Sequence, residues 1–379
     1  MRKDWEYKKL GEVAFYPNDK ISVDKIGANH YVGVENLLKD KAGILFSDQL
    51  PNAATATCFK YNDILLGNIR PYLKKIWLSN TEGGASGDVI VIRTSSDNIL
   101  PNYLFKLLSS DKFFNYFNLY TKGAKMPRGD KNAIAKFIVP TPPKPTQLAI
   151  VAELDKINEL IQLKKEQLKD YDQLAQSIFY EMFGDPVENE KGWEVKKLGE
   201  IALEKMSYGS GASAVPYNQK IRYIRITDID ELGCLKKDIV SPNICEDKYL
   251  LSDGDILFAR SGATVGKTFL FKSTYGSCIY AGYLIRLRPN TQIVIPEYVY
   301  HYTKTHYYRS FIESNQRVVA QPNINAQQYS SLKLPLPPLP LQQQFAARIE
   351  AIERQKQQVS ETIKDLETLL ASRMQYWFD

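Results

Sequence analysis

The most constraining feature of this sequence is that its patterns occur twice in the same order. WEYKKLGEV at 5–13 returns as WEVKKLGEI at 193–201, 188 positions further along the chain. IVPTPPKPTQLAIVAELDKI at 138–157 returns as KLPLPPLPLQQQFAARIEAI at 333–352, 195 positions further along. The offset changes by a few residues while the order stays the same, so the sequence predicts one fold used twice.

Each half contains a globular region, a proline-rich segment and then a helix. The globular regions hold short strand-like runs between turn signals, such as DVIVIRT at 88–94 and AGYLIRLRP at 281–289. The segments VPTPPKP and LPLPPLP follow. Because proline disfavours helix in the residue before it, each segment is expected to end a globular region and lead into the helix. A proline-rich ligand for another protein is the alternative, but both copies lie at the same boundary.

The two helices are expected to be long and amphipathic. Their apolar residues recur at alternating steps of three and four, the spacing of a seam that faces another helix, interrupted by Lys164, Lys356 and Arg373. Gly184 and Pro186 are expected to end the first helix. Each helix could pack only on its own globular region, but two matching seams favour an antiparallel coiled coil. The predicted seam contains Leu154, Ile157, Ile161, Leu168, Ile349, Ile352, Val359, Ile363, Leu366 and Leu370.

Composition limits the class of protein. The chain is 44% hydrophobic, and its net charge of +6 is compatible with a polyanionic partner. It has four cysteines without a CxxC pair and three histidines without ligand spacing, which argues against a metal site and suits a reducing compartment. No run approaches the ~18 apolar residues of a membrane span, and the first residues lack a signal-peptide pattern. We therefore expect a cytoplasmic protein.

RSGATVGKT at 260–268 superficially resembles a nucleotide-binding P-loop. Gly262 and Gly266 enclose three residues where the P-loop requires four, and a strand rather than a helix is expected after Lys267. TPPK and LPPL lack the amide or carboxylate that precedes the prolines in the motif of amino-methyltransferases. TDIDE at 227–231 is acidic, but it is expected to be a solvated turn. These patterns favour a binding protein over an enzyme.

The whole chain resembles the specificity subunit of type I restriction–modification systems. The most specific matches are GDILFARSGATVGKTFLF at 254–271, VVAQPNINAQQYSSLKLPLPPLPLQQQ at 318–344 and the doubled proline-rich segment with its helix. In the first half, GNIRPYLKKIW at 67–77 stands where the second half has ARSGATVGKTF. The first half therefore departs further from the sequence motifs typical of the family.

The resemblance implies an α+β fold with an internal pseudo-two-fold repeat. Two target recognition domains would be joined by two long antiparallel helices that form a coiled coil. The expected boundaries are 1–141 for the first recognition domain, 142–184 for the first helix, 185–336 for the second domain and 337–379 for the second helix.

The resemblance also implies a function. Each domain would read one half of a bipartite, asymmetric site in double-stranded DNA. The helices would set the distance between the half-sites and dock two modification subunits, which are adenine methyltransferases and in turn bind restriction subunits. The chain itself would bind no cofactor, while S-adenosylmethionine, ATP and magnesium would serve the partner subunits. The alternatives are a catalytic restriction or methyltransferase enzyme with two recognition domains, and a stand-alone DNA-binding regulator.

Polar loop residues beside strands are the candidates for DNA contact, since Arg, Lys, Asn, Gln, Ser and Thr can bind phosphates and base edges. Two clusters are expected in each half. Those of the second half are Arg260, Ser261, Thr264 and Lys267, with glycines for close backbone approach, and then Gln321, Asn323 and Asn325. Those of the first half are Arg70, Tyr72, Lys74 and Lys75, and then Lys125, Arg128 and Asn132.

Overall fold

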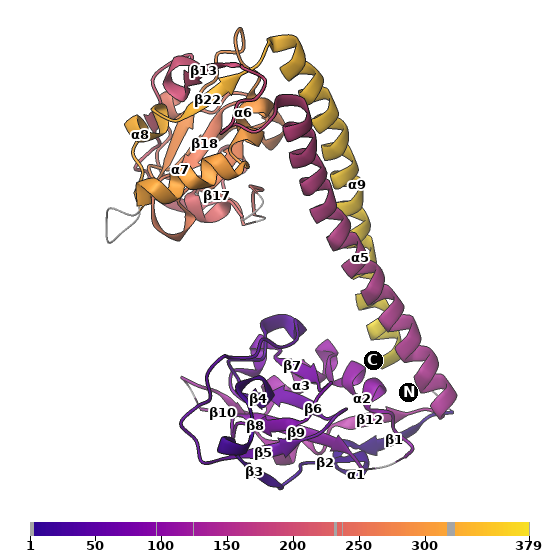
Figure 1. Cartoon of the computed structure of the whole chain (residues 1–379). Helices are drawn as coiled ribbons and strands as arrows, with labels where there is room; N and C mark the ends of the chain where they lie inside the picture. Colours follow the sequence, from indigo (N-terminus) through magenta and orange to yellow (C-terminus); the bar gives the residue numbers. More distant parts are fainter. Residues whose placement is uncertain are drawn as a thin grey trace. The chain divides into compact units, whose positions relative to one another are not determined.

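The computed structural model contains two compact units (Figure 1). Unit 1 comprises Met1–Lys165 and Glu361–Asp379, and unit 2 comprises Glu166–Ser360. The structure describes residues 4–95, 97–123, 125–230, 233–236, 238–316 and 323–378.

Unit 1 is built on two four-stranded sheets. The first has the order β2-β9-β6-β7 and is antiparallel, and the second has the order β3-β5-β8-β4, with β4 parallel to β8. The first sheet consists of β2 (Ala14–Phe15), β9 (Val89–Thr94), β6 (Ile64–Gly67) and β7 (Ile76–Leu78). The second consists of β3 (Lys20–Ser22), β5 (Thr55–Phe59), β8 (Gly83–Ala85) and β4 (Tyr31–Val32). Two small antiparallel pairs join β1 (Glu6–Lys9) to β12 (Ile138–Thr141) and β10 (Thr121–Lys122) to β11 (Arg128–Gly129).

The helices of unit 1 bury their apolar faces in one core. That core also includes side chains of β6 and β9. In α3, Ser110 caps the first turn by accepting a hydrogen bond from the Phe113 N–H at 3.2 Å, and Phe113, Phe114 and Phe117 are fully buried. Burial of each ring contributes roughly 1.5–3 kcal/mol, so this helix is held mainly by its aromatic face. The short helices of the unit are α1 (Leu10–Val13), α2 (Pro101–Leu108), α3 (Asp111–Leu119) and α4 (Lys131–Ile134).

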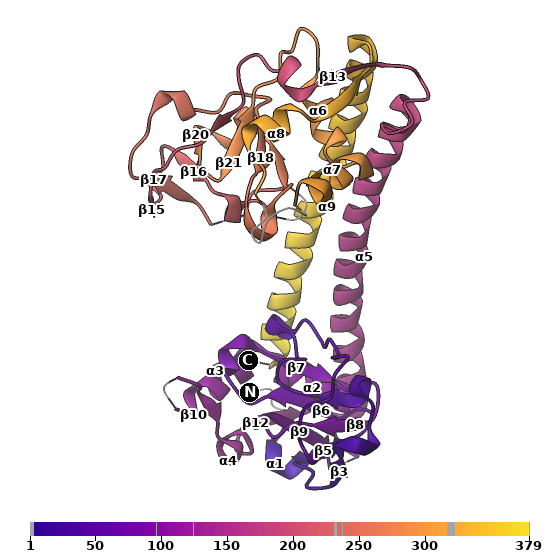
Figure 2. The ribbon, with the colours of Figure 1, turned by 60° about the vertical axis from the view of Figure 1, so that its left-hand side comes forward.

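Unit 2 repeats this arrangement. Its four-stranded antiparallel sheet has the order β14-β21-β18-β19. In it, β21 and β18 take the places of β9 and β6 of unit 1, and Figure 2 labels all four. These strands are β14 (Ser207–Tyr208), β21 (Leu284–Leu287), β18 (Ile256–Ala259) and β19 (Thr268–Leu270). The smaller sheets pair β16 (Arg222–Ile224) with β20 (Cys278–Tyr280), β15 (Ala214–Pro216) with β17 (Val240–Pro242) and β13 (Glu194–Lys197) with β22 (Lys333–Leu336). The short helices are α6 (Pro296–Tyr302), α7 (His306–Gln316) and α8 (Ala326–Ser330).

The α+β fold with two similar globular regions is confirmed, and the predicted strand after Lys267 is β19. The equivalence extends to single contacts. Gln147 is fully buried and accepts a hydrogen bond from the Leu100 N–H at 2.9 Å, and the equally buried Gln342 accepts one from the Ile295 N–H at 2.8 Å. Each glutamine therefore fastens the first turns of a long helix to the globular part of its own unit.

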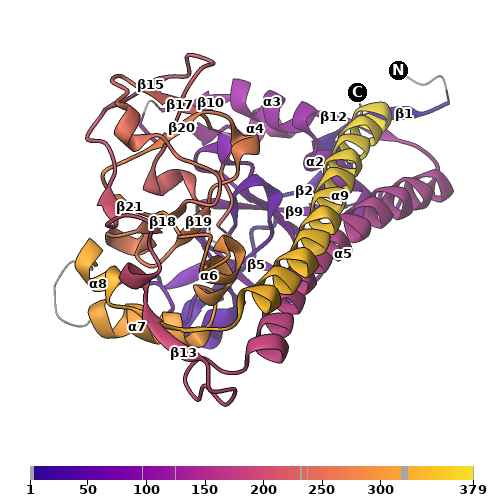
Figure 3. The ribbon, with the colours of Figure 1, turned by 90° about the horizontal axis from the view of Figure 1, so that it is seen from above.

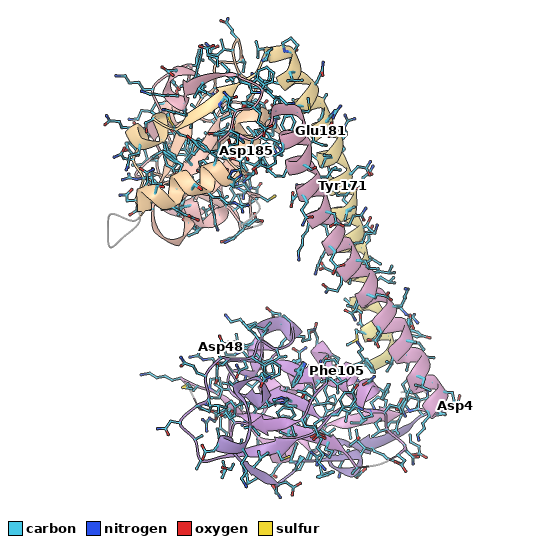
Figure 4. All side chains as sticks on the ribbon, viewed as in Figure 1. Asp4, Asp48, Phe105, Tyr171, Glu181 and Asp185 are labelled. Carbon is cyan, nitrogen blue, oxygen red and sulfur yellow. The ribbon has the colours of Figure 1, made fainter. Side chains whose placement is uncertain are left out.

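The long helices are α5 (Lys144–Phe183) and α9 (Leu339–Phe378), of 40 residues each. Gly184 follows α5 with a φ of 78°, a left-handed conformation that suits the predicted helix end. Both units contain a segment of each helix. Figure 4 marks Tyr171 and Glu181 on α5 and Asp185 just beyond its end.

In unit 1, the segments of α5 and α9 pair in opposite directions. Arg373 and Trp377 of α9 both donate hydrogen bonds to the Glu153 carboxylate, the latter from Nε1 at 2.9 Å. Towards the other end of this segment, Lys165 Nζ lies 3.3 Å from Glu367 Oε1. The pair is therefore antiparallel in this unit.

In unit 2, the corresponding segments are also antiparallel (Figure 3). Lys356 Nζ lies 2.8 Å from Asp172 Oδ1, and Arg348 Nη1 lies 3.8 Å from Glu181 Oε1. Lys356 and Arg373, which interrupt the apolar pattern in the sequence, thus form ion pairs with the opposite helix.

The predicted seam residues differ in burial. Buried are Leu154, Ile157, Ile161, Ile349, Ile352, Val359 and Ile363. Half-buried are Leu168, Leu366 and Leu370. The neighbouring Leu163 lies off the predicted seam spacing and is 51% exposed. Burial therefore follows the predicted seam positions and does not include every leucine of the helix.

Candidate nucleic-acid interface

In each unit, one β-bridge joins the two segments that the sequence suggests for DNA contact. Ile69 bridges to Arg128 in unit 1, and Ser261 bridges to Asn323 in unit 2. A backbone hydrogen bond lies beside each bridge, from the Gly129 N–H to the Asn68 carbonyl at 3.3 Å and from the Ile324 N–H to the Arg260 carbonyl at 2.9 Å. The two polar clusters of each half therefore form one surface. We call these surfaces edge 1 (68–75 and 122–132) and edge 2 (260–267 and 323–325).

Arg260 is the best-fixed cation of edge 2. It is half-buried, and its Nε donates a hydrogen bond to Asn323 Oδ1 at 3.3 Å. Its guanidinium carbon lies 4.7 Å from the ring centroid of Tyr208, within cation–π range. Sequence reasoning missed Tyr208. The repeat gives no signal for it, because the offset of 188 positions aligns Phe15 with Leu203 rather than with Tyr208.

The rest of the 260–267 loop is partly occupied by its own contacts. Thr264 Oγ1 donates to the Ser261 carbonyl at 3.1 Å, and Ser261, Thr264 and Lys267 are half-buried. Gly266 has a φ of 86°, and an added Cβ would lie 3.0 Å from Ile312. The fold therefore requires glycine there for its own packing, and close approach of DNA at Gly266 stays a prediction. Gly262 has a φ of 69° with open space around the Cβ position.

The second cluster of edge 2 divides by role. Asn323 is exposed, and Gln321 lies outside the described residues. Asn325 caps α8, because its Oδ1 accepts a hydrogen bond from the Gln328 N–H at 2.8 Å. A bidentate adenine contact would use the same oxygen, so Asn325 serves as a helix cap and its base contact stays a prediction.

In the first cluster of edge 1, two of the four side chains are exposed and the other two have partners within the unit. Arg70 and Tyr72 are exposed, and the Arg70 N–H donates to the Pro127 carbonyl at 2.9 Å. Lys74 Nζ lies 2.7 Å from Asp111 Oδ1. Lys75 Nζ donates to the Val34 carbonyl at 2.6 Å, and burial lowers the pKa of this amine. One donor of the Lys75 ammonium thus satisfies a backbone carbonyl of the same unit, and its contact with DNA stays a prediction.

The second cluster of edge 1 is exposed. Lys125, Arg128 and Asn132 are all exposed, and Arg128 Nη2 lies 2.7 Å from Asp88 Oδ1. Asp130 caps α4 by accepting from the Asn132 N–H at 2.9 Å, at the position equivalent to Asn325. Asp130 also binds Lys122 Nζ at 3.0 Å, and this hydrogen bond lowers the pKa of the carboxyl group.

The acidic run TDIDE takes part in an ion pair within unit 2. Asp228 of TDIDE is 3% exposed and its carboxylate accepts from Arg225 Nη2 at 2.7 Å, which corrects the expected solvated turn, while Glu231 lies outside the described residues. No group of three or more His, Cys, Asp or Glu side chains suited to a metal occurs among the residues described. Within the same residues, no helix has the length and apolarity needed to cross a membrane.

A family model for the type I restriction modification DNA specificity domain matches residues 2–170 and again residues 190–368. The chain belongs to this family. The two matches are the two halves of the sequence repeat, and each spans the edge of its unit. The predicted resemblance is thereby confirmed.

Relatives and solved structures of the specificity family extend over the chain. The putative type I restriction enzyme MjaX specificity subunit of Methanocaldococcus jannaschii is 31% identical over 405 aligned residues, covering 97% of this chain and 93% of the relative. The MjaIX specificity subunit of the same organism is 24% identical over 295 residues, covering 69% and 67%.

Two solved structures share the fold. The S subunit of a type I restriction-modification system from M. genitalium has a TM-score of 0.56 at 13% identity, covering 98% of this chain and 95% of that one. A chain from a study of complex assembly and conformational transition in the type I R-M system has a TM-score of 0.60 at 22% identity, covering 100% and 98%.

Proposed function

We propose that this chain is the DNA-recognition subunit of a type I restriction–modification complex. Unit 1 and unit 2 each read one half of a split, non-palindromic site in double-stranded DNA. Membership of the specificity family supports this proposal, as does the net charge of +6.

The observation that carries the proposal is the pair of equivalent bridges with unlike side chains. The Ile69–Arg128 and Ser261–Asn323 bridges have the same place in the two repeats, and both units expose polar donors beside them. Equivalent backbones would offer similar shapes to DNA, whereas unlike side chains would select different bases. A duplicated reader with differing edges fits an asymmetric target better than a palindrome.

The paired segments of α5 and α9 would dock two modification subunits, through which restriction subunits join. Exposed apolar side chains on these helices support the proposal, because Leu148, Leu163 and Leu174 of α5 and Leu369 of α9 are between 46% and 58% exposed. The helices would also set the distance between the half-sites. S-adenosylmethionine, ATP and magnesium would be used by the partner subunits, and this chain would neither bind them nor catalyse a reaction.

The test is to express the full chain with the modification subunit of the same organism, purify the complex and map methylated adenines by sequencing. We expect co-purification and one split, non-palindromic methylated motif. The chain alone should neither methylate DNA nor hydrolyse ATP. A continuous palindromic motif contradicts the proposal, as does ATP turnover by the chain alone that Lys267→Ala abolishes.

A further inference from the structure

The guanidinium of Arg260 is held from two sides. Its guanidinium carbon lies 4.7 Å from the centroid of the Tyr208 ring, and Nε donates to Asn323 Oδ1 at 3.3 Å. Among the residues that the structure describes, no hydrogen bond or ion pair engages Nη1 or Nη2. The two Nη groups are thus the donors of the guanidinium that can bind a ligand.

The two residues that hold Arg260 are themselves fixed. Tyr208 pairs with Ile285 in the sheet, and its hydroxyl accepts a hydrogen bond from the Ala326 N–H at 3.1 Å. Asn323 is fixed by its bridge to Ser261. An arginine side chain loses rotamer entropy when a ligand immobilises it, and a prior restraint of this kind reduces that cost of binding.

We infer that Arg260 recognises a guanine in the half-site read by unit 2, and that Tyr208 and Asn323 are positioning residues. This inference rests on the proposed function. Two parallel N–H donors in one plane match the N7 and O6 acceptors that guanine presents in the major groove. The tyrosine ring and the Asn323 hydrogen bond restrict the orientation of the guanidinium. Orientation matters for a base edge, whereas a phosphate accepts a cation from many directions.

Unit 1 does not offer the same group. The residue equivalent to Arg260 is Asn68, whose Oδ1 accepts a hydrogen bond from the Gly129 N–H at 3.1 Å. The residue equivalent to Asn323 is Arg128, which is 57% exposed in its side chain and bound to Asp88 at 2.7 Å. The arginine and asparagine are exchanged across the same bridge, and the arginine of unit 1 already has a carboxylate partner. The guanine contact is therefore specific to unit 2.

The experiment uses the full chain in complex with its modification subunit. Methylated motifs are mapped for the wild type, Arg260→Ala, Arg260→Lys and, as a matched control, Arg309→Ala, which removes an exposed arginine of α7 in the same unit. The wild-type motif should contain a guanine on either strand in one half-site. Arg260→Ala and Arg260→Lys should relax that position alone by roughly 5- to 150-fold, the factor for a bidentate contact of about 1–3 kcal/mol. Arg309→Ala should leave the motif unchanged.

A binding measurement covers the case in which a variant abolishes methylation. Affinities of the wild-type and Arg260→Ala complexes are measured for the native duplex and for a duplex with 7-deazaguanine at the assigned position, which lacks the N7 acceptor. The substitution should weaken the wild type and leave the variant nearly indifferent. Equal weakening of both complexes overturns the inference, as does a uniform loss across all sequences in Arg260→Ala, which would indicate a phosphate contact. Absence of a split motif in the wild type instead overturns the proposed function.

The positioning roles of Tyr208 and Asn323 are tested by the base preference of their own variants. Tyr208→Phe keeps the ring face and should retain the guanine preference, whereas Tyr208→Ala should relax the same position as Arg260→Ala. Asn323→Ala should weaken preference at that position and at no other. Relaxation of a different base by Asn323→Ala would show that Asn323 reads DNA itself and contradict its positioning role.

Discussion

Immediately before β6 and β18, unit 1 and unit 2 have an equivalent ion pair between a buried aspartate and an arginine. Asp63 is 2% exposed and accepts from Arg93 Nε at 2.8 Å, and Asp255 is 1% exposed and accepts from Arg288 Nε at the same distance. Each aspartate also accepts the N–H of a residue three positions earlier, Lys60 at 2.7 Å and Ser252 at 2.8 Å.

At their edges, the same two units differ. Unit 1 places Asn68 and Arg128 on the two sides of its bridge, whereas unit 2 places Arg260 and Asn323 there. A buried charge cannot lose its partner without a large cost, while exposed side chains can change at little cost. The two units therefore share a scaffold and differ in the edge proposed to read DNA.

The largest expected effect concerns the retained ion pairs. Asp63→Ala and Asp255→Ala should each lower the free energy of unfolding of their own unit by about 3–5 kcal/mol, because an arginine is left without its buried partner. Hydrogen exchange under native conditions, resolved by peptide, measures the two units separately. The exposed Asp48→Ala is the control (Figure 4) and should stay within about 0.5 kcal/mol. A large loss in one unit and none in the other would break the equivalence of the scaffolds.

The helix seam is the next test of the scaffold. Ile161 is 4% exposed, so Ile161→Asp buries a carboxylate without a partner and should cost roughly 3 kcal/mol in unit 1. Leu163, two residues along the same helix, is 51% exposed and Leu163→Asp should be nearly silent. Denaturant unfolding of both variants measures the difference. Equal losses for the two substitutions would be at odds with the seam.

A smaller effect distinguishes the units by their response to acid. Burial lowers the pKa of His301 in unit 2 to about 3, while the equivalent residue of unit 1, Lys106, forms an ion pair with Asp155. Because the pKa is lowered in the folded state, the unfolded chain binds the proton first as the pH falls below about 6.5. Unit 2 should therefore lose about 1.4 kcal/mol for each pH unit between 6.5 and 3.

This pH effect is measured by thermal unfolding at pH 7 and pH 5 for the wild type and His301→Gln. The wild type should lose about 2 kcal/mol through this group over that interval, and the variant should not show this part of the loss. An identical pH dependence in the two proteins would show that His301 does not contribute to it.

Much of the fold could be predicted from the sequence, because it depends on repetition and periodicity. The duplicated patterns gave the two units, and alternating apolar steps gave a seam in which Ile161 and Ile352 are buried. The site was predicted less completely, since composition does not reveal which polar groups are used internally. Lys75 binds the Val34 carbonyl and Asn325 caps a helix, although both look like free ligands in the sequence.

Tyr208 is, by contrast, a contact residue of the site that the sequence did not predict. It lies far from Arg260 in the sequence and reaches it only because β14 pairs with β21, whose neighbour β18 leads directly to Arg260. No local pattern predicts that contact. The sequence repeat does not reveal it either, because no aromatic residue of unit 1 aligns with Tyr208 at the offset of the opening repeat.

The central claim, that the scaffold is shared and each globular part selects its own half-site, is tested most directly by making the two halves alike. In a chain whose residues 6–141 are replaced by a second copy of 194–336, both units would carry edge 2. Because the segments of α5 and α9 run in opposite directions within each unit, the equal half-sites should be read with opposite polarity. Methylome sequencing of the folded chimaera with its modification subunit should yield a split palindrome built from the unit 2 half-site. Retention of the original non-palindromic motif would contradict the account.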